Sequence, residues 1–256
     1  MPINPYIGVL FGYGSDGGTV MSGSERIGLY KQTLKNEDKA TERLSKDAAI
    51  TRDLDRLQKA IDKAKSPEEL LKDPTARRVL LESFGLAGQE NNVGLAVKAL
   101  TADLSKDGNL PSRLTNKAWS AAATTLDFAK SGLDKLRDPK VFAEIRANYI
   151  EYKRVDEVSA QSQPVADALH VRSMEDKTPG VYNILGDKIL RRVALTLAGL
   201  PETIAFQSIE SQARQLEKRI DLKQFATPEG REKLIQRYLV MAGDETTSAS
   251  LISYTV

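Results

Sequence analysis

An internal repeat of seventeen residues constrains this chain more than any other feature. The segments LLKDPTARRVLLESFGL (70–86) and ILGDKILRRVALTLAGL (184–200) align without a gap. The identical residues are Leu71, Asp73, Arg77, Arg78, Val79, Leu81, Gly85 and Leu86 in the first copy, and Leu185, Asp187, Arg191, Arg192, Val193, Leu195, Gly199 and Leu200 in the second. Two copies are too few for a solenoid, so we expect them to share one core.

The similarity continues beyond the repeat as a pattern. Apolar residues then step by four, three and four in both copies: Val93, Val97, Leu100 and Leu104, and Ile209, Ala213, Leu216 and Ile220. Thr115 and Thr227 follow as candidate N-caps of a third helix. The sequence therefore predicts a duplicated three-helix unit with copies over 66–130 and 181–241.

Cap signals place further helix boundaries. Ser22 and Glu25 form the S-x-x-E capping box, and Ser66-Pro67, Asp73-Pro74 and Asp138-Pro139 each join a cap to a proline at the first helical position. We expect helices over 139–159 and 165–174 between the two copies. No run of alternating β-branched residues interrupts this pattern, so the predicted fold class is all-α.

A charged segment over residues 25–65 precedes the first copy. Its apolar residues recur at helical spacing: Ile27, Tyr30, Leu34, Leu44 and Ala48, then Ile50, Leu54, Leu57, Ile61 and Ala64. The two sets do not share one heptad phase, so we expect a single long amphipathic helix with a bend near 48–51. Its narrow apolar seam suits packing on its own domain or, as in a coiled coil, on a partner helix.

These signals divide the chain into four parts. They are a flexible glycine-rich leader over 1–24, the long helix over 25–65, one helical domain over 66–241 and a flexible tail over 242–256. The tail leaves an alternative open, because its apolar residues (Leu251, Ile252, Tyr254 and Val256) also suit a short strand on the sheet edge of a partner.

The leader contains the spacing of a dinucleotide-binding loop, G-x-G-x-x-G, at Gly12, Gly14 and Gly17. Such a loop lies between a strand and a helix, and an acidic residue about 20 positions on ends a second strand. Glu37 and Asp38 stand at that distance, but within a helical pattern. We therefore interpret the glycines as a flexible lead-in to the first helix.

Candidate catalytic and metal-binding patterns are absent from the sequence. There is no cysteine, and the single histidine, His170, has no nucleophile motif beside it. We predict no catalytic residue, no cofactor and no metal site, and hence no enzyme. The repeated pairs Arg77-Arg78 and Arg191-Arg192 leave an anion-binding alternative open. The simpler interpretation is an aspartate cap paired with an arginine four residues on.

The charge balance argues against nucleic acid as a partner. The 37 basic and 35 acidic residues are well mixed, and the net charge is +2. No apolar stretch approaches the roughly 20 residues of a transmembrane helix. The N-terminus lacks the basic region of a cleavable signal peptide, so we expect none.

The second copy also carries a resemblance to a known family. The runs VYNILGDKILRRVALTLAGLP (181–201) and LEKRIDL (216–222) are similar to the signature half of the bacterial domain-of-unknown-function family 1217. The matching residues are Tyr182, Ile184, Leu185, Asp187, Lys188, Leu190, Gly199, Leu200, Pro201, Glu217, Lys218, Arg219, Asp221 and Leu222. The first copy resembles the other half, so that the resemblance covers residues 66–241. Members tend to lie among flagellar genes and have no established activity, which implies a flagellum-associated helical protein.

We therefore expect a non-enzymatic protein that acts by protein–protein interaction at the flagellum, as a structural component or an assembly factor. The expected contact regions are residues 25–65, which would also support a homo-oligomer, and the termini. The alternatives are a cytoplasmic export chaperone or adaptor for flagellar subunits, and an anion-binding helical domain. The expected location is the cytoplasm, or outside the cell after passage through the flagellar secretion apparatus.

Overall fold

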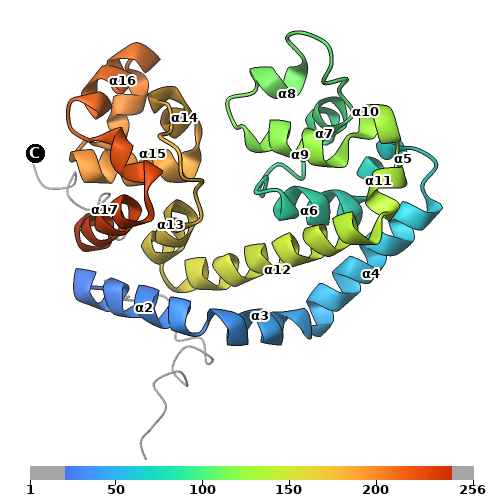
Figure 1. The fold of residues 1–256 in the computed structure, drawn as a ribbon, viewed down its shortest axis with the longest axis horizontal. Coiled ribbons are helices and arrows are strands. Elements are labelled where there is room, and N and C mark those ends of the chain that lie inside the picture. Colours follow the sequence, from blue (N-terminus) through green and yellow to red (C-terminus); the bar gives the residue numbers. More distant parts are fainter. Residues whose placement is uncertain (1–20, 244–256) are drawn as a thin grey trace, which may run out of the picture.

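The computed structural model describes residues 21–243, and every regular element in that range is a helix. The all-α prediction is confirmed. Two lobes lie side by side above a base of long helices (Figure 1). Residues 1–20 of the predicted leader and 244–256 of the predicted tail lie outside the described residues; within the described range, α2 already begins at Gly23, inside the predicted leader, and Ala242 of the predicted tail is buried.

The base consists of α12 (Pro139–Gln161) and an arc of three helices, α2 (Gly23–Lys35), α3 (Glu37–Ser45) and α4 (Ala48–Lys63). α12 runs beneath the first lobe and ends at α13 of the second (Figure 1), and it packs against α6, α13 and α3. At the two ends of the arc, α4 packs against α6 and α2 against α17.

The first lobe contains seven helices within the described range: α5 (Pro67–Lys72), α6 (Pro74–Ser83), α7 (Val93–Leu100), α8 (Leu110–Arg113), α9 (Ala118–Leu126), α10 (Phe128–Ser131) and α11 (Asp134–Arg137). The second lobe contains five α-helices and two 3₁₀ helices: α13 (Gln163–Arg172), α14 (Val181–Gly186), α15 (Lys188–Ala198), η1 (Glu202–Phe206), α16 (Ile209–Glu217), η2 (Leu222–Ala226) and α17 (Pro228–Met241).

The single long helix predicted over 25–65 is wrong, because the chain breaks twice. α2 ends at Lys35 with Asn36 as its C-cap, a break that the sequence pattern did not predict. The second break is just ahead of the predicted bend, at Asp47, whose carboxylate accepts hydrogen bonds from the backbone N–H groups of Ala49 (2.8 Å) and Ile50 (3.0 Å). This side-chain cap starts α4 in a new direction.

The apolar seam of this segment is buried within the chain. Tyr30 of α2 belongs to the core of the second lobe, whereas the later seam residues belong to the core of the first: Leu44, Ile50, Leu54, Leu57, Ile61 and Ala64. The packing partner thus changes between Tyr30 and Leu44, at the break after α2, whereas the residues on both sides of the phase shift near 48–51 pack on the first lobe. Because these side chains are covered by their own chain, the seam does not offer a partner helix the coiled-coil contact that was expected.

The two repeat copies do not share one core, contrary to the prediction. One cluster of buried side chains extends from Leu44 to Ile150, and a second extends from Val158 to Ala242 and includes Tyr30. Each copy packs against base helices and thereby buries enough apolar surface for a core of its own. The lobes touch where α14 ends, since a Cβ added to Gly186 would lie 2.2 Å from Thr115 Cγ2.

Both copies of the repeat form the same local structure. The aspartates Asp73 and Asp187 accept hydrogen bonds from backbone N–H groups in the first turn of α6 and α15. Both helices then end at a glycine with positive φ, 70° at Gly85 and 60° at Gly199. In each, the following leucine donates its N–H to a carbonyl five residues back, at 2.8 Å and 2.9 Å. This is the Schellman arrangement, and it confirms the predicted cap and stop signals.

A helix follows each predicted cap, but the predicted N-cap of this third helix is correct in the second copy alone. The Thr227 hydroxyl accepts a hydrogen bond from the Gly230 N–H (3.1 Å) and caps α17. Thr115 caps no helix, because the chain turns again before α9, whose N-cap is Lys117. In the first lobe Thr115 instead makes the contact with Gly186 described above.

Candidate functional site

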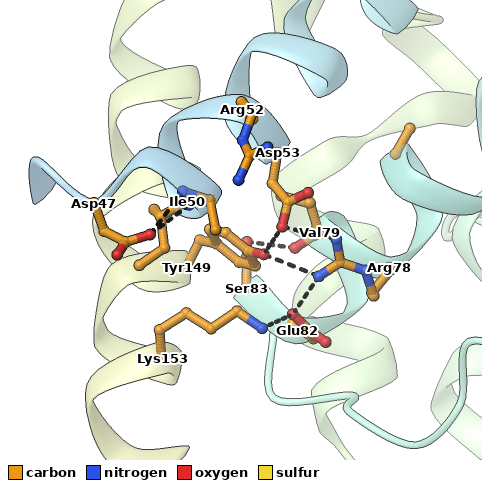
Figure 2. Close-up of polar contacts among 12 residues, drawn as sticks. Asp47, Ile50, Arg52, Asp53, Arg78, Val79, Glu82, Ser83, Tyr149 and Lys153 are labelled. Atoms are coloured by element: carbon orange, nitrogen blue, oxygen red, sulfur yellow. Dashed lines mark hydrogen bonds and ion pairs between the residues drawn. The ribbon is translucent and has the colours of Figure 1, made fainter. Parts of the chain in front are cut away.

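The second arginine of each repeat copy lies in a cluster with an aspartate and a tyrosine from two other helices. In the first lobe these are Arg78 of α6, Asp53 of α4 and Tyr149 of α12 (Figure 2). Arg78 Nη2 lies 2.8 Å from Asp53 Oδ2. The Tyr149 hydroxyl donates to the same oxygen (2.7 Å) and accepts from Arg78 Nη1 (2.9 Å). The cluster therefore ties two base helices to the first lobe.

Glu82 and Lys153 extend this cluster (Figure 2). Glu82 Oε2 lies 3.3 Å from Arg78 Nη1 and 2.9 Å from Lys153 Nζ. The Lys153 ammonium also lies 5.1 Å from the centroid of the Tyr149 ring, within the range of a cation–π interaction. Each carboxylate in the group thus faces at least one cation.

The second lobe holds a more deeply buried cluster of the same composition. Arg192 of α15 donates two hydrogen bonds to Asp167 of α13, from Nε to Oδ2 (2.7 Å) and from Nη2 to Oδ1 (2.5 Å). The Tyr238 hydroxyl of α17 donates to Oδ2 (2.6 Å), and Gln163 Nε2 donates to Oδ1 (2.9 Å). Asp167 is 0% exposed, so these four hydrogen bonds replace the water that its carboxylate loses.

The two clusters also match in their spacing along the chain. Twenty-five residues separate the aspartate from the arginine in both lobes. Each tyrosine lies eleven residues after the cap of its helix, Asp138 for Tyr149 and Thr227 for Tyr238. This spacing favours a duplicated unit that pairs α4 with α13, α6 with α15 and α12 with α17, in place of the three-helix unit proposed from the sequence.

The pKa values of the cluster side chains are shifted by burial and by their hydrogen-bond partners. Burial raises the pKa of the Tyr149 hydroxyl far above its ordinary value, and the hydrogen bond to Asp53 raises it further. Burial and the Asp167 charge do the same for Tyr238. Burial works to raise the pKa of Asp53, but hydrogen bonds from Arg78 and Tyr149 outweigh it and lower the pKa. The pair is thus held as a neutral phenol and an ionised carboxylate, without a base poised near neutral pH.

The first arginine of each pair has a different environment in each lobe. Arg77 is 7% exposed, and its guanidinium donates to the backbone carbonyls of Leu71 (2.8 Å) and Glu90 (2.7 Å). The bond to Leu71 satisfies a carbonyl group that the end of α5 leaves without a helical partner, and the bond to Glu90 holds the loop before α7. Arg191 is exposed, and its side chain forms no hydrogen bond or ion pair with any described residue.

Arg191 lines a pocket of about 340 Å³ between α15, the start of α13 and η1. The residues that line it are Gln163, Lys188, Arg191, Arg192, Leu195, Glu202 and Ala205. Arg192 is already paired with Asp167, so the pocket lining adds two further cationic side chains, Lys188 and Arg191, and one carboxylate, that of Glu202. The anion-binding alternative therefore has a pocket in the second lobe, at Arg191-Arg192. In the first lobe, Arg77 and Arg78 are both engaged in hydrogen bonds within the fold.

Two exposed apolar side chains follow this pocket in the chain. Phe206, the last residue of η1, directly follows Ala205 of the pocket wall and is 92% exposed. Ile209, at the start of α16, is 43% exposed. We call Lys188, Arg191, Phe206 and Ile209 the α15–η1 surface.

The remaining sequence candidates lie in ordinary structural positions. His170 is half-buried, and its Nε2 lies 3.7 Å from Oδ2 of Asp187, the residue that caps α15. Among residues 21–243, no group of three or more histidine, aspartate or glutamate side chains is arranged to hold a metal ion.

The aspartates and tyrosines of the two clusters were not predicted from the sequence. A signal for Asp53 and Asp167 was present, because they stand at the same offset from the aligned Arg78 and Arg192. The aligned segments begin at residues 70 and 184, so they do not include α4 and α13. For the tyrosines, the signal is their equal distance from an N-cap that precedes a proline.

Residues 83–230 match a family model described as "Protein of unknown function (DUF1217)", more than half of the chain. The chain belongs to this family. The resemblance drawn from Tyr182 to Leu222 is thereby confirmed at the family level. No curated protein matches this DUF1217 chain.

The fold is similar to that of a solved structure, the crystal structure of protein AGR_C_984 from Agrobacterium tumefaciens, a structural genomics target. The two chains are 22% identical, with a TM-score of 0.72 over 89% of this chain and 96% of the other. This similarity extends the shared fold well beyond the residues that match the family model. In the described part of this DUF1217 protein, no helix has the length and apolar character needed to cross a membrane.

Proposed function

We propose that this DUF1217 protein acts by protein–protein interaction at the bacterial flagellum, as a structural component or an assembly factor, and not as an enzyme. The observation that supports an interaction role is the exposure of the Phe206 side chain. Its ring is 92% exposed at the end of η1, whereas Ile204 in the same short helix is buried and anchors it. Aromatic side chains of this kind dominate the binding energy of many interfaces.

The polar clusters support a role without catalysis. A catalytic carboxylate or phenol is normally tuned toward neutral pH and open to substrate. Here the Asp53 and Tyr149 pKa values move away from neutrality, and Asp167 is enclosed by its hydrogen-bond donors. The first cluster joins the base helices α4 and α12 to the first lobe, and the second joins α13, α15 and α17 within the second lobe.

The flagellar setting rests on the resemblance given above, since members of the family tend to lie among flagellar genes. The α15–η1 surface of the second lobe replaces residues 25–65 as the expected contact region, because the fold buries the apolar seam of that segment. Either location, the cytoplasm or the exterior after flagellar export, is compatible with such a surface.

A deletion strain tests the proposal. We expect loss of swimming in soft agar, with missing or short filaments in electron micrographs, and recovery when the intact gene is restored. Normal motility and normal filaments in the deletion strain would contradict the flagellar assignment.

Fractionation of the complemented strain then separates the two interaction roles. Protein in sheared filaments or basal bodies identifies a structural component. Protein that stays in the cytoplasm and co-purifies with one flagellar subunit at fixed stoichiometry identifies the export chaperone or adaptor.

A further inference from the structure

Two cations on α15 are not used by the fold. Lys188 and Arg191 are exposed and stand three residues apart on one face of the helix, and their side chains form no hydrogen bond or ion pair with any described residue. Like charges at this spacing destabilise an isolated helix by a few tenths of a kcal/mol, about as much as opposite charges stabilise it. An anion bound between them removes that repulsion.

The repeat shows that this arrangement is specific to the second lobe. The counterpart of Arg191 in the first lobe is Arg77, which is buried against backbone carbonyls, and the counterpart of Lys188 is Pro74. The same aligned segment therefore serves the fold in one lobe and presents two solvent-exposed cations in the other.

The walls of the pocket are held in place by the fold. Arg192 is fixed by its two hydrogen bonds to the buried Asp167, and Gln163 donates to the same carboxylate. On the far side, η1 contributes Glu202 and Ala205 and then continues into the exposed Phe206. The exposed Phe206 thus directly follows a residue of the wall of the basic pocket in the chain.

From this juxtaposition we propose that the α15–η1 surface binds an acidic amphipathic segment of a partner protein. Carboxylates of the segment pair with Lys188 and Arg191, and its apolar side chains cover Phe206 and Ile209. This inference rests on the proposed function and names the chemistry of the partner. A small anion would satisfy the pocket but leave the aromatic ring in water, and the near balance of basic and acidic residues disfavours nucleic acid.

The test uses the full chain and two synthetic probes. The first is a fluorescein-labelled amphipathic peptide of leucine and glutamate, and the second has glutamine at every glutamate position. Fluorescence anisotropy at low salt measures both affinities. We expect the glutamate peptide to bind at least tenfold more tightly than the glutamine peptide, and salt to weaken it.

Two double variants locate the site. K188A/R191A removes the proposed contacts, and R56A/K59A removes two exposed cations at the same three-residue spacing on α4. We expect about tenfold weaker binding of the glutamate peptide for the first, corresponding to two exposed charge pairs, and wild-type binding for the second. The F206S variant weakens binding of the glutamate peptide by a similar factor.

Equal binding of the two peptides, or equal effects of the two double variants, would overturn the proposal. Protection against thermal unfolding by inorganic phosphate that depends on Lys188 and Arg191, without peptide binding, would also overturn it and identify a small-anion pocket. If either result is found and the deletion strain still has a motility defect, the proposed function stands and only the binding proposal fails. The failure of one proposal can thus be distinguished from the failure of the other.

Discussion

Replacing Asp167 by asparagine is the most informative perturbation of the core. Asp167 is 0% exposed, and its carboxylate accepts hydrogen bonds from Arg192, Tyr238 and Gln163. Each of these hydrogen-bond partners is a donor. An asparagine at this position would lose the charge and turn an NH₂ group toward one of those donors. Breaking a buried ion pair in this way costs about 3–5 kcal/mol.

The first lobe provides the matched comparison, Asp53→Asn. The Asp53 side chain is 19% exposed, so an amide there can turn its NH₂ group toward water, and Arg78 keeps its contact with Glu82. We expect a loss of about 1–2 kcal/mol, the usual range for a single exchanged hydrogen bond. The two variants replace the same residue type in equivalent clusters and differ mainly in burial.

Urea denaturation followed by circular dichroism measures both losses. The account predicts a much lower midpoint for Asp167→Asn than for Asp53→Asn. A loss of about 4 kcal/mol corresponds to roughly a thousandfold change in the ratio of folded to unfolded protein. A loss below about 1 kcal/mol for Asp167→Asn, or equal losses for the two variants, would refute the reasoning that burial sets the strength of these clusters.

Three further predictions follow from packing and from the pKa directions. Gly186→Ala places a Cβ 2.2 Å from Thr115 Cγ2 and lowers stability by about 1–3 kcal/mol. The control variant Gly28→Ala places its Cβ in open space within α2 and raises stability by about 0.8 kcal/mol. Thermal melts measure both changes. The pKa of Asp53 is lowered on folding, so its contribution to the free energy of unfolding is complete above about pH 5 and disappears as the pH falls below about 4. In an acid titration, the stability of Asp53→Asn therefore declines less steeply than that of the wild type. Burial and the nearby Glu232 raise the pKa of Tyr30 to about 12. Its contribution to the free energy of unfolding is therefore complete below about pH 10 and disappears as the pH rises through about 12. In an alkaline titration, the stability of Tyr30→Phe lacks this part of the decline.

Local signals in the sequence predicted the helix boundaries well. Ser66, Asp73 and Thr227 cap the helices that they were expected to cap, since a cap acts on backbone N–H groups only two or three residues away. Gly85 and Gly199 stop their helices for an equally local reason, the positive φ of the stop.

Long-range features were harder to predict. The break at Asn36 separates α2, which packs on the second lobe, from helices that pack on the first, and neither partner is visible from the segment itself. Arg77 and Arg191 are identical in the aligned repeat, yet one is buried and the other exposed, because only the fold decides what lies opposite each. The exposure of Phe206 depends in the same way on where η1 lies.

Swimming of a strain whose own gene carries F206S tests the central claim most directly. Because the ring is already exposed, the substitution leaves the fold intact, and immunoblots verify that the protein level is unchanged. The account predicts a swim diameter in soft agar close to that of the deletion strain. A diameter equal to that of the wild type would contradict an interaction role for this surface.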